Sequence, residues 1–291
     1  MSLADAIQKA RPALSASSVR TYVSILSSLH KKCIGGELEV KDFDDTAKFI
    51  KFLKDKTAAS RKTVLSALFI LTTKPEYRAA MVSDIDTYNA DVKSQVMSEK
   101  QKAAAISLDD VKAVLGHLAV RAAEIYKKKA HTVSDLLAIQ DYILLTLMAG
   151  SHIAPRRSLD YCAFKIKNID IQKDNYLDKG QLIFNTFKTA KTYGKQEVPC
   201  PPELKKILTR WFKINPTQHL LFNSKLEPLS SPQITQIFNR IFNGRKVSTN
   251  QIRHAYLTER FSNYSKEQKV VDETMKNMGS SPAVLSSYVR F

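Results

Sequence analysis

The chain has 291 residues, 44% of them hydrophobic, which is enough apolar material for the cores of two domains. Its formal net charge of +17 and isoelectric point near 9.7 favour a polyanionic partner, most often nucleic acid. The small number of glycines and prolines and the lack of a long polar tract argue against extensive disorder.

The three cysteines, Cys33, Cys162 and Cys200, are far apart and form neither a Cys-x-x-Cys pair nor a His/Cys cluster. This argues against a disulfide framework and a zinc site, and it indicates a reducing, intracellular location. The opening residues have no apolar signal region and no apolar run reaches the length of a membrane span. We therefore expect no membrane partner.

The first hundred residues are predicted to be helical. Residues 15–33, 44–56 and 60–73 each combine a polar start with apolar residues at helical spacing. Arg61 and Lys62 lie near the start of the last stretch, where free backbone N–H groups also attract phosphate. Both are candidates for DNA contacts, with an ordinary solvated surface as the alternative.

The polar stretch SEKQKAAA (98–105) predicts a linker, and a new helix is predicted to begin after it. Ser107 and Asp110 have the spacing of a capping box at that start. We therefore expect a helical domain over residues 1–100, a linker over 101–106 and a second domain over 107–291.

The second domain is predicted to be mixed. Residues 132–150 read as a buried helix, and residues 174–201 alternate as short strands around the turn-like sequences DKG and TYGK. Helices are then predicted over 202–214, 231–242 and 249–261. The expected fold class is mainly α with a small β-hairpin or three-stranded sheet.

Four short segments of the second domain carry candidate chemistry. They are PRRSLDYCAFKIKNID (155–170), KTAKTYGKQEVP (188–199), NQIRHAYLTERF (250–261) and MGSSPAVLSSY (278–288). Each by itself has an ordinary explanation, such as surface charge or a packed histidine, because isolated motif matches are weak signals.

In order and spacing, the four segments resemble the tyrosine recombinase (integrase) family. The family's catalytic domain has Arg-x-x-Glu/Asp, a hairpin lysine, His-x-x-Arg and a late nucleophilic tyrosine. The resemblance covers about residues 106–291, and the helical first domain is more weakly similar to the family's core-binding domain. It implies these site residues: Arg157 and Arg253 on the scissile phosphate, Lys191 as general acid with Lys188 as the alternative, and Tyr288 as nucleophile.

The chain departs from the family pattern at two polar positions. Asn250 stands where the family has the His of His-x-x-Arg, and Ser280 stands where it has the His or Trp before the tyrosine. General acid or base help is therefore left open among Asn250, His254 and Lys191. Variants of this kind resemble the divergent integrases of large DNA viruses and related mobile elements.

Two neighbouring arginines compete for the first site position. On a helix Arg156 and Arg157 would point about 100° apart, so both could not face one phosphate equally. The spacing to Asp160 favours Arg157, with Asp160 orienting Arg157 or supporting the local fold. The residues expected to contact DNA outside the catalytic set are Arg156, Lys188, His254, Arg61 and Lys62.

The resemblance implies a site-specific recombinase that cuts and rejoins double-stranded DNA through a covalent 3′-phosphotyrosyl intermediate, without metal, ATP or other cofactor. It implies a homo-tetramer on paired DNA sites, each protomer clamping duplex DNA between its domains, and a location with DNA, in the host nucleus or a viral replication compartment if the source is viral. A type IB topoisomerase-like enzyme and a DNA-binding protein that has lost catalysis are the alternatives.

Overall fold

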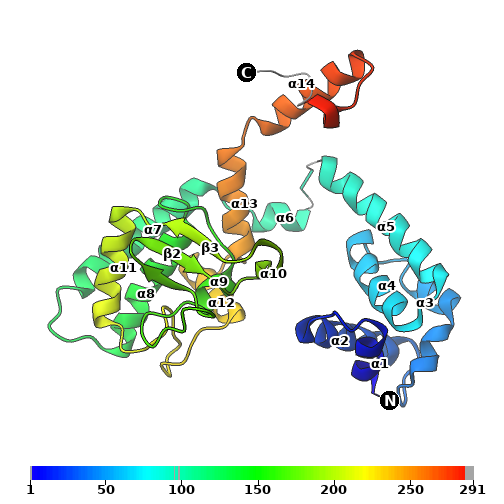
Figure 1. Ribbon diagram of the computed structural model, residues 1–291, viewed down its shortest axis with the longest axis horizontal. Coiled ribbons are helices and arrows are strands. Elements are labelled where there is room, and N and C mark those ends of the chain that lie inside the picture. Colours follow the sequence, from blue (N-terminus) through cyan, green and yellow to red (C-terminus); the bar gives the residue numbers. More distant parts are fainter. Residues whose placement is uncertain (1, 95, 98, 286–291) are drawn as a thin grey trace. The chain divides into compact units, whose positions relative to one another are not determined.

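A computed structural model gives the fold of residues 2–94, 96–97 and 99–285, which divide into two compact units, Met1–Ser98 and Glu99–Phe291 (Figure 1). The described chain is mostly helical and contains one small antiparallel sheet of three strands. The predicted fold class, mainly α with a small sheet, is confirmed.

The first unit consists of helices. Their bounds are α1 Leu3–Ala10, α2 Ala16–Cys33, the 3₁₀ helix η1 Val40–Asp44, α3 Thr46–Phe52, α4 Ala58–Thr72 and α5 Pro75–Ser94. Side chains of Ser15, Asp45 and Thr57 accept hydrogen bonds from backbone N–H groups in the first turns of α2, α3 and α4. These caps explain why the helices begin within two residues of the polar starts seen in the sequence.

The core of the first unit is aromatic and aliphatic. Phe43, Phe49 and Tyr77 are fully buried. The Tyr77 hydroxyl donates to the Phe43 carbonyl at 2.8 Å, so the polar end of this buried ring is satisfied.

The second unit contains the remaining elements. Their bounds are α6 Glu99–Ala104, α7 Leu108–Ile125, α8 Val133–Met148, α9 Ser158–Cys162, β1 Tyr176–Asp178, β2 Gln181–Phe184, α10 Ala190–Tyr193, β3 Gln196–Pro199, α11 Pro202–Ile214, α12 Ser231–Ile241, α13 Thr249–Arg260, α14 Tyr264–Asn277 and the 3₁₀ helix η2 Pro282–Val284. Helix α7 begins with the predicted capping box of Ser107 and Asp110.

The stretch predicted as a linker has structure of its own. Residues 99–104 form helix α6, which belongs to the second unit. Alanine, lysine and glutamine are good helix formers, so a polar composition there does not prevent a helix.

The three strands pair in the order β1–β2–β3. Lys179 and Gly180 join β1 to β2 with φ of 45° and 82°, the left-handed conformation that a two-residue hairpin turn requires. The last β2–β3 pair is Phe184 opposite Gln196. The connection between those two strands, residues 185–195, leaves the sheet at that pair and contains α10.

Helix α8 is the centre of the second core. Ile139, Ile143 and Leu144 are fully buried on it. Gln140 is also fully buried, and its side-chain amide exchanges two hydrogen bonds with the backbone of Phe222, at 2.7 and 3.0 Å. The polar side chain of Gln140 is therefore hydrogen-bonded within the core, and it holds the backbone at Phe222 against α8.

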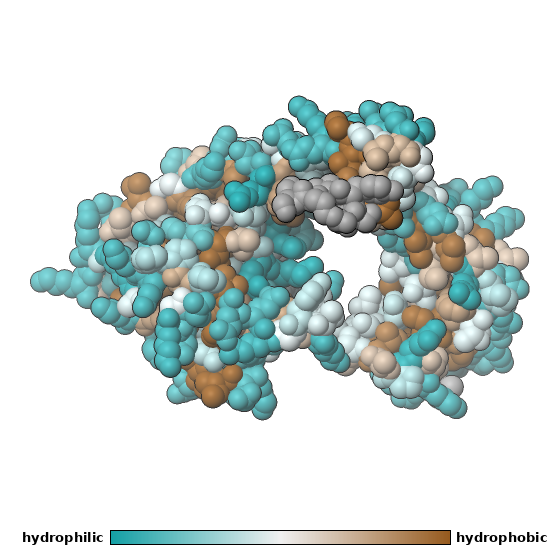
Figure 2. Space-filling view, turned by 45° about the horizontal axis from the view of Figure 1, so that its top comes forward, coloured by the Kyte–Doolittle hydropathy of each residue, from teal (hydrophilic) through white to brown (hydrophobic). Residues whose placement is uncertain are grey.

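The face of the molecule in Figure 2 is mostly hydrophilic, with hydrophobic residues scattered among polar ones. Among the helices that the structure describes, none has the length and apolar character to cross a bilayer.

Candidate active site

The first site segment is non-helical where it leads into helix α9. Arg157 is the N-cap of α9, with φ −77° and ψ 152°, and its side chain is exposed. The prediction that placed Arg156 and Arg157 on a helix is therefore wrong, because the helix begins only at Ser158. The two arginines have different surroundings, since Arg156 is hydrogen-bonded to Asp160 whereas the Arg157 side chain is exposed.

Helix α9 is held in place by its buried tyrosine. Tyr161 is 1% exposed, and its hydroxyl donates to the carbonyl of Leu147 in α8 at 3.1 Å. The short helix therefore has a defined position on the central core helix, and so have Arg157 before it and Asp160 within it.

Asp160 is a buried carboxylate among arginines. It is 3% exposed, and its Oδ2 accepts a hydrogen bond from Nε of Arg156 at 2.7 Å. Burial raises the pKa of Asp160, while the charges of Arg156, Arg157 and Arg253 oppose that rise. The partner of Asp160 is thus Arg156, and of the two expected roles for Asp160 the support of the local fold is the one seen.

Helix α13 supplies Arg253. Ile252 and Ala255 are buried on its inner face, and Arg253 is half-buried beside them. Burial lowers the pKa of Arg253, and the charge of Arg157 lowers it further, against the opposing effect of Asp160. The Arg157 and Arg253 guanidinium groups are therefore close enough to repel each other.

The cluster carries an uncompensated positive charge. Among the described residues, Asp160 is the one carboxylate that acts on Arg253, and three arginines, Arg156, Arg157 and Arg253, act on Asp160. Since like charges in a partly buried place destabilise one another, an anion bound between Arg157 and Arg253 would relieve the repulsion. Two guanidinium forks at one place match the oxygens of a phosphate.

The lysines of the hairpin segment lie in the connection between β2 and β3. Lys188 follows the buried Phe187, and Lys191 lies in α10. Both lysine side chains are exposed, and the contacts described for this part of the chain give neither of them a carboxylate partner. Because the buried Phe187 fixes the start of this connection, an exposed lysine that follows it can present its ammonium group to a ligand.

Asn175 ties this connection to α9. It is fully buried, and its Nδ2 donates to the carbonyls of Asp160 and Thr186, at 2.7 and 2.8 Å. Its Oδ1 accepts from the backbone N–H groups of Asn185 and Thr186, both at 2.8 Å. Sequence reasoning missed Asn175, because an asparagine before a predicted strand has no pattern that distinguishes it from a turn residue.

The other polar candidates lie on α13 and after α14. Asn250 and His254 are exposed, one helical turn apart on the same side of α13. Ser280 follows α14, and its backbone N–H donates to the carbonyl of Met275 at 2.8 Å. No contact in the described part of the chain joins Ser280 to the arginines. Tyr288 lies outside the described residues.

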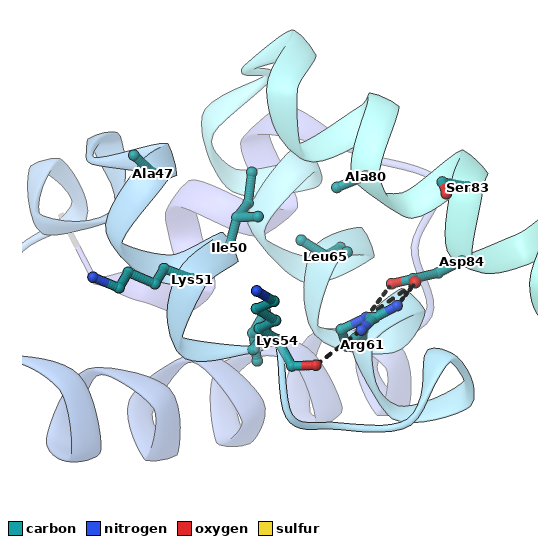
Figure 3. Close-up of a pocket in the computed structure, with 10 residues that line it drawn as sticks. Ala47, Ile50, Lys51, Lys54, Arg61, Leu65, Ala80, Ser83 and Asp84 are labelled. Carbon is teal, nitrogen blue, oxygen red and sulfur yellow. Dashed lines mark hydrogen bonds and ion pairs between the residues drawn. The ribbon is translucent and has the colours of Figure 1, made fainter.

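In the first unit, Arg61 and Lys62 differ sharply. Arg61 forms an ion pair with Asp84, which is 3% exposed, and donates to the carbonyl of Lys54 at 3.1 Å (Figure 3). The Nζ of Lys62 lies 3.0 Å from the ring centroid of Tyr88. Because the Arg61 guanidinium is already bound, we expect Lys62 rather than Arg61 to reach a phosphate.

No protein-family model matches the chain, and no curated protein matches it in sequence. Among solved structures, it is similar to a lambda integrase tetramer bound to a Holliday junction, at 15% identity and a TM-score of 0.47, covering 90% of this chain and 72% of that chain. It is similar to a lambda integrase dimer bound to a COC′ core site, at 16% identity and a TM-score of 0.48, covering 91% of this chain and 94% of that chain. It is also similar to a lambda integrase bound to DNA, at 17% identity and a TM-score of 0.47, covering 91% of this chain and 89% of that chain. Lambda integrase is a tyrosine recombinase, the family that the sequence motifs resemble.

Proposed function

We propose that this protein is a DNA recombinase of the tyrosine type, which cuts and rejoins double-stranded DNA through a covalent 3′-phosphotyrosyl intermediate. The observation that supports this most is the gathering of Arg157 and Arg253, from segments far apart in sequence, beside the buried Asp160. Two arginines at one place would bind the oxygens of a phosphodiester. For a strongly basic chain, the partner that carries phosphodiesters is DNA.

Stabilisation of the transition state explains why both of these positions are arginine. When a nucleophile attacks a phosphodiester, negative charge builds up on the two non-bridging oxygens in the transition state. Arg157 and Arg253 would each offer a planar fork of N–H donors to those oxygens, and Arg253 is already partly shielded from water. A donor fixed before the reaction stabilises the transition state more than the ground state.

The nucleophile in this proposal is Tyr288, assigned from its motif. Its hydroxyl oxygen forms a bond to phosphorus and loses its proton to a base or to water. The bond between phosphorus and the 5′ oxygen breaks, and that oxygen keeps the electron pair and takes up a proton. The phosphotyrosyl bond conserves the energy of the broken one, so a 5′ hydroxyl can reverse the step without ATP.

The proton for the leaving 5′ oxygen comes from a lysine in our proposal. Lys191 is the first candidate and Lys188 the second, both exposed in the β2–β3 connection. Asn250, His254 and Ser280 are the polar residues that we assign to further contacts with the phosphate or its neighbours. A general acid is worth about 100-fold to 10,000-fold in rate, so the lysine should be at least as important as an arginine.

Assembly and partners are part of the proposal. The charge of +17 fits a protein that contacts many DNA phosphates. We propose that four copies act on two paired sites, because strands are exchanged between two duplexes. A mobile element or a viral genome is the DNA that we propose for integration.

Two other functions use the same features. A type IB topoisomerase-like enzyme would use the same arginines and tyrosine, but as a monomer that nicks a single duplex. A DNA-binding protein that has lost catalysis is suggested by Asn250 and Ser280, the two departures from the family pattern. The retained arginines, lysine and tyrosine favour an enzyme over this last alternative.

The decisive experiment is capture of a covalent adduct on a suicide substrate. The purified full chain is incubated, in EDTA and without nucleotide, with nicked duplexes that lose a short oligonucleotide on cleavage. We expect an adduct that resists denaturant and is removed by protease. If a monomer of the protein forms the adduct on a single duplex, the topoisomerase-like alternative is favoured. If the protein binds the duplexes of a library but forms an adduct with none of them, loss of catalysis is favoured.

A further inference from the structure

Arg156, which was expected to contact a DNA phosphate, instead has its guanidinium group bound inside the second unit. Its side chain is 16% exposed. Nε donates to Asp160 at 2.7 Å and Nη1 donates to Oε1 of Gln196 at 2.9 Å. Its Cζ lies 3.9 Å from the ring centroid of Phe184 and 5.3 Å from that of Phe187. The expectation for Arg156 therefore does not fit its surroundings.

Three of these four partners mark the two ends of the β2–β3 connection. Phe184 and Gln196 are the cross-strand pair at which the connection leaves the sheet. Phe187 is the buried side chain at the base of the connection, directly before Lys188. Arg156 therefore contacts both the outgoing and the returning end of the segment that carries the candidate lysines.

The fourth partner belongs to the arginine cluster. Asp160 lies within the electrostatic influence of Arg157 and Arg253, and its second oxygen, Oδ1, is buried and has no hydrogen-bond partner among the described residues. One planar guanidinium group thus joins Asp160, the member of the arginine cluster that lies on α9, to the base of the lysine-bearing connection.

We propose that Arg156 is a positioning residue that holds the β2–β3 connection, and with it the general-acid lysine, in place relative to Arg157 and Arg253. This proposal rests on the proposed function. A lysine has a flexible stem, so the place of its ammonium group depends on where the backbone of residues 185–195 is held. A misplacement of about 1 Å can cost about 100-fold in rate.

Lysine cannot replace Arg156 in this role. The guanidinium group donates in two directions within one plane and stacks its face on Phe184. An ammonium group is a compact charge that could keep the bond to Asp160 but not reach Gln196 while covering the ring. Arg156→Lys keeps the charge and removes the link.

The test uses two DNA substrates that differ in one atom. In the first the scissile bond joins phosphorus to a 5′ oxygen, and in the second sulfur replaces that oxygen. The oxygen must be protonated as it leaves, whereas a thiol is acidic enough to leave as the thiolate with its electron pair. Single-turnover cleavage by the full chain is measured on both at saturating DNA for wild type, Arg156→Lys, Gln196→Ala and Arg157→Lys.

We expect Arg156→Lys to cleave the oxygen substrate about 100-fold more slowly than wild type and the sulfur substrate at nearly the wild-type rate. Gln196→Ala, which removes one hydrogen bond and risks little of the fold, should show the same rescue with a smaller defect. Arg157→Lys should be slow on both substrates, because its contact is with the non-bridging oxygens.

Equal slowing of Arg156→Lys on both substrates, or no slowing on either, would overturn the proposal for Arg156. If Arg156→Lys does not fold, as judged by thermal unfolding, the rescue pattern of Gln196→Ala decides in the same way. Failure of the wild-type protein to form an adduct with either substrate would instead overturn the proposed function.

Discussion

Gly150 and Tyr256 approach each other so closely that no side chain fits between them: a Cβ atom on Gly150 would lie 2.2 Å from Cδ2 of Tyr256. Gly150 also has φ of +77°, a conformation that other residues rarely adopt. Tyr256 is one helical turn from Arg253 on α13, so this contact sets the place of a site arginine against the end of α8.

Gly150→Ala should therefore destabilise the protein and slow cleavage. Left-handed strain and overpacking together cost about 2–5 kcal/mol, and any shift of Tyr256 moves Arg253. The measurements are thermal unfolding and single-turnover cleavage. The matched control is Gly116→Ala in α7, where a Cβ meets nothing within 4 Å, and we expect it to stabilise by about 0.5–1 kcal/mol. If Gly150→Ala unfolded at the wild-type temperature, the close approach of Gly150 to Tyr256 would not contribute to stability.

Arg157→Lys and Arg253→Lys should each slow cleavage by about 100-fold to 1,000-fold with little change in DNA affinity. Lysine keeps the charge but loses the two-pronged grip on the developing negative oxygens, and one such donor is worth about that factor. Arg260→Lys, at the exposed end of the same helix α13, is the control and should cleave at close to the wild-type rate. Normal cleavage by Arg157→Lys would mean that another residue binds the phosphate at this position.

Tyr288→Phe should abolish the covalent adduct and leave DNA affinity nearly unchanged, because one hydroxyl is lost from a large phosphate-contacting surface. Adduct formation is measured on denaturing gels with the suicide substrate, and affinity by filter binding. Tyr264→Phe and Tyr256→Phe are the controls, and both should still form the adduct. A protease-sensitive adduct with Tyr288→Phe would assign the nucleophile to another tyrosine.

Arg61→Gln and Lys62→Gln should have opposite consequences although the residues are neighbours. Removing Arg61 leaves the carboxylate of Asp84 buried without its ion pair, which costs about 3–5 kcal/mol of stability. Lys62→Gln should barely change stability but reduce the slope of log K against log salt by about 0.9, the loss of one phosphate contact. The measurements are thermal unfolding and DNA binding across a salt series.

If Arg61→Gln is as stable as wild type and its slope of log K against log salt is reduced, Arg61 contacts DNA after all. A binding constant that barely responds to salt in the wild-type protein would speak against DNA as the partner altogether.

The sequence by itself determined the local elements and their order. The starts of α2 and α7 follow from Ser15 and Ser107, because a side-chain oxygen one position before a helix satisfies a free backbone N–H group. The β1–β2 hairpin follows from Lys179 and Gly180, because few residues accept two successive left-handed conformations. These are short-range effects, which depend only on residues close in the chain.

Only the tertiary structure decided which arginine holds Asp160. Arg156 and Arg157 are adjacent in sequence and equal in charge, and spacing favoured Arg157 as the catalytic arginine but left Asp160 either to orient Arg157 or to support the local fold. The choice depends on Phe184 and Gln196, which the β2–β3 pairing brings beside Arg156. Arg61 changed its role for the same reason, since Asp84 on α5 is buried against it. A side chain's partners are set by segments that fold onto it from elsewhere, and no pattern within its own segment contains that information.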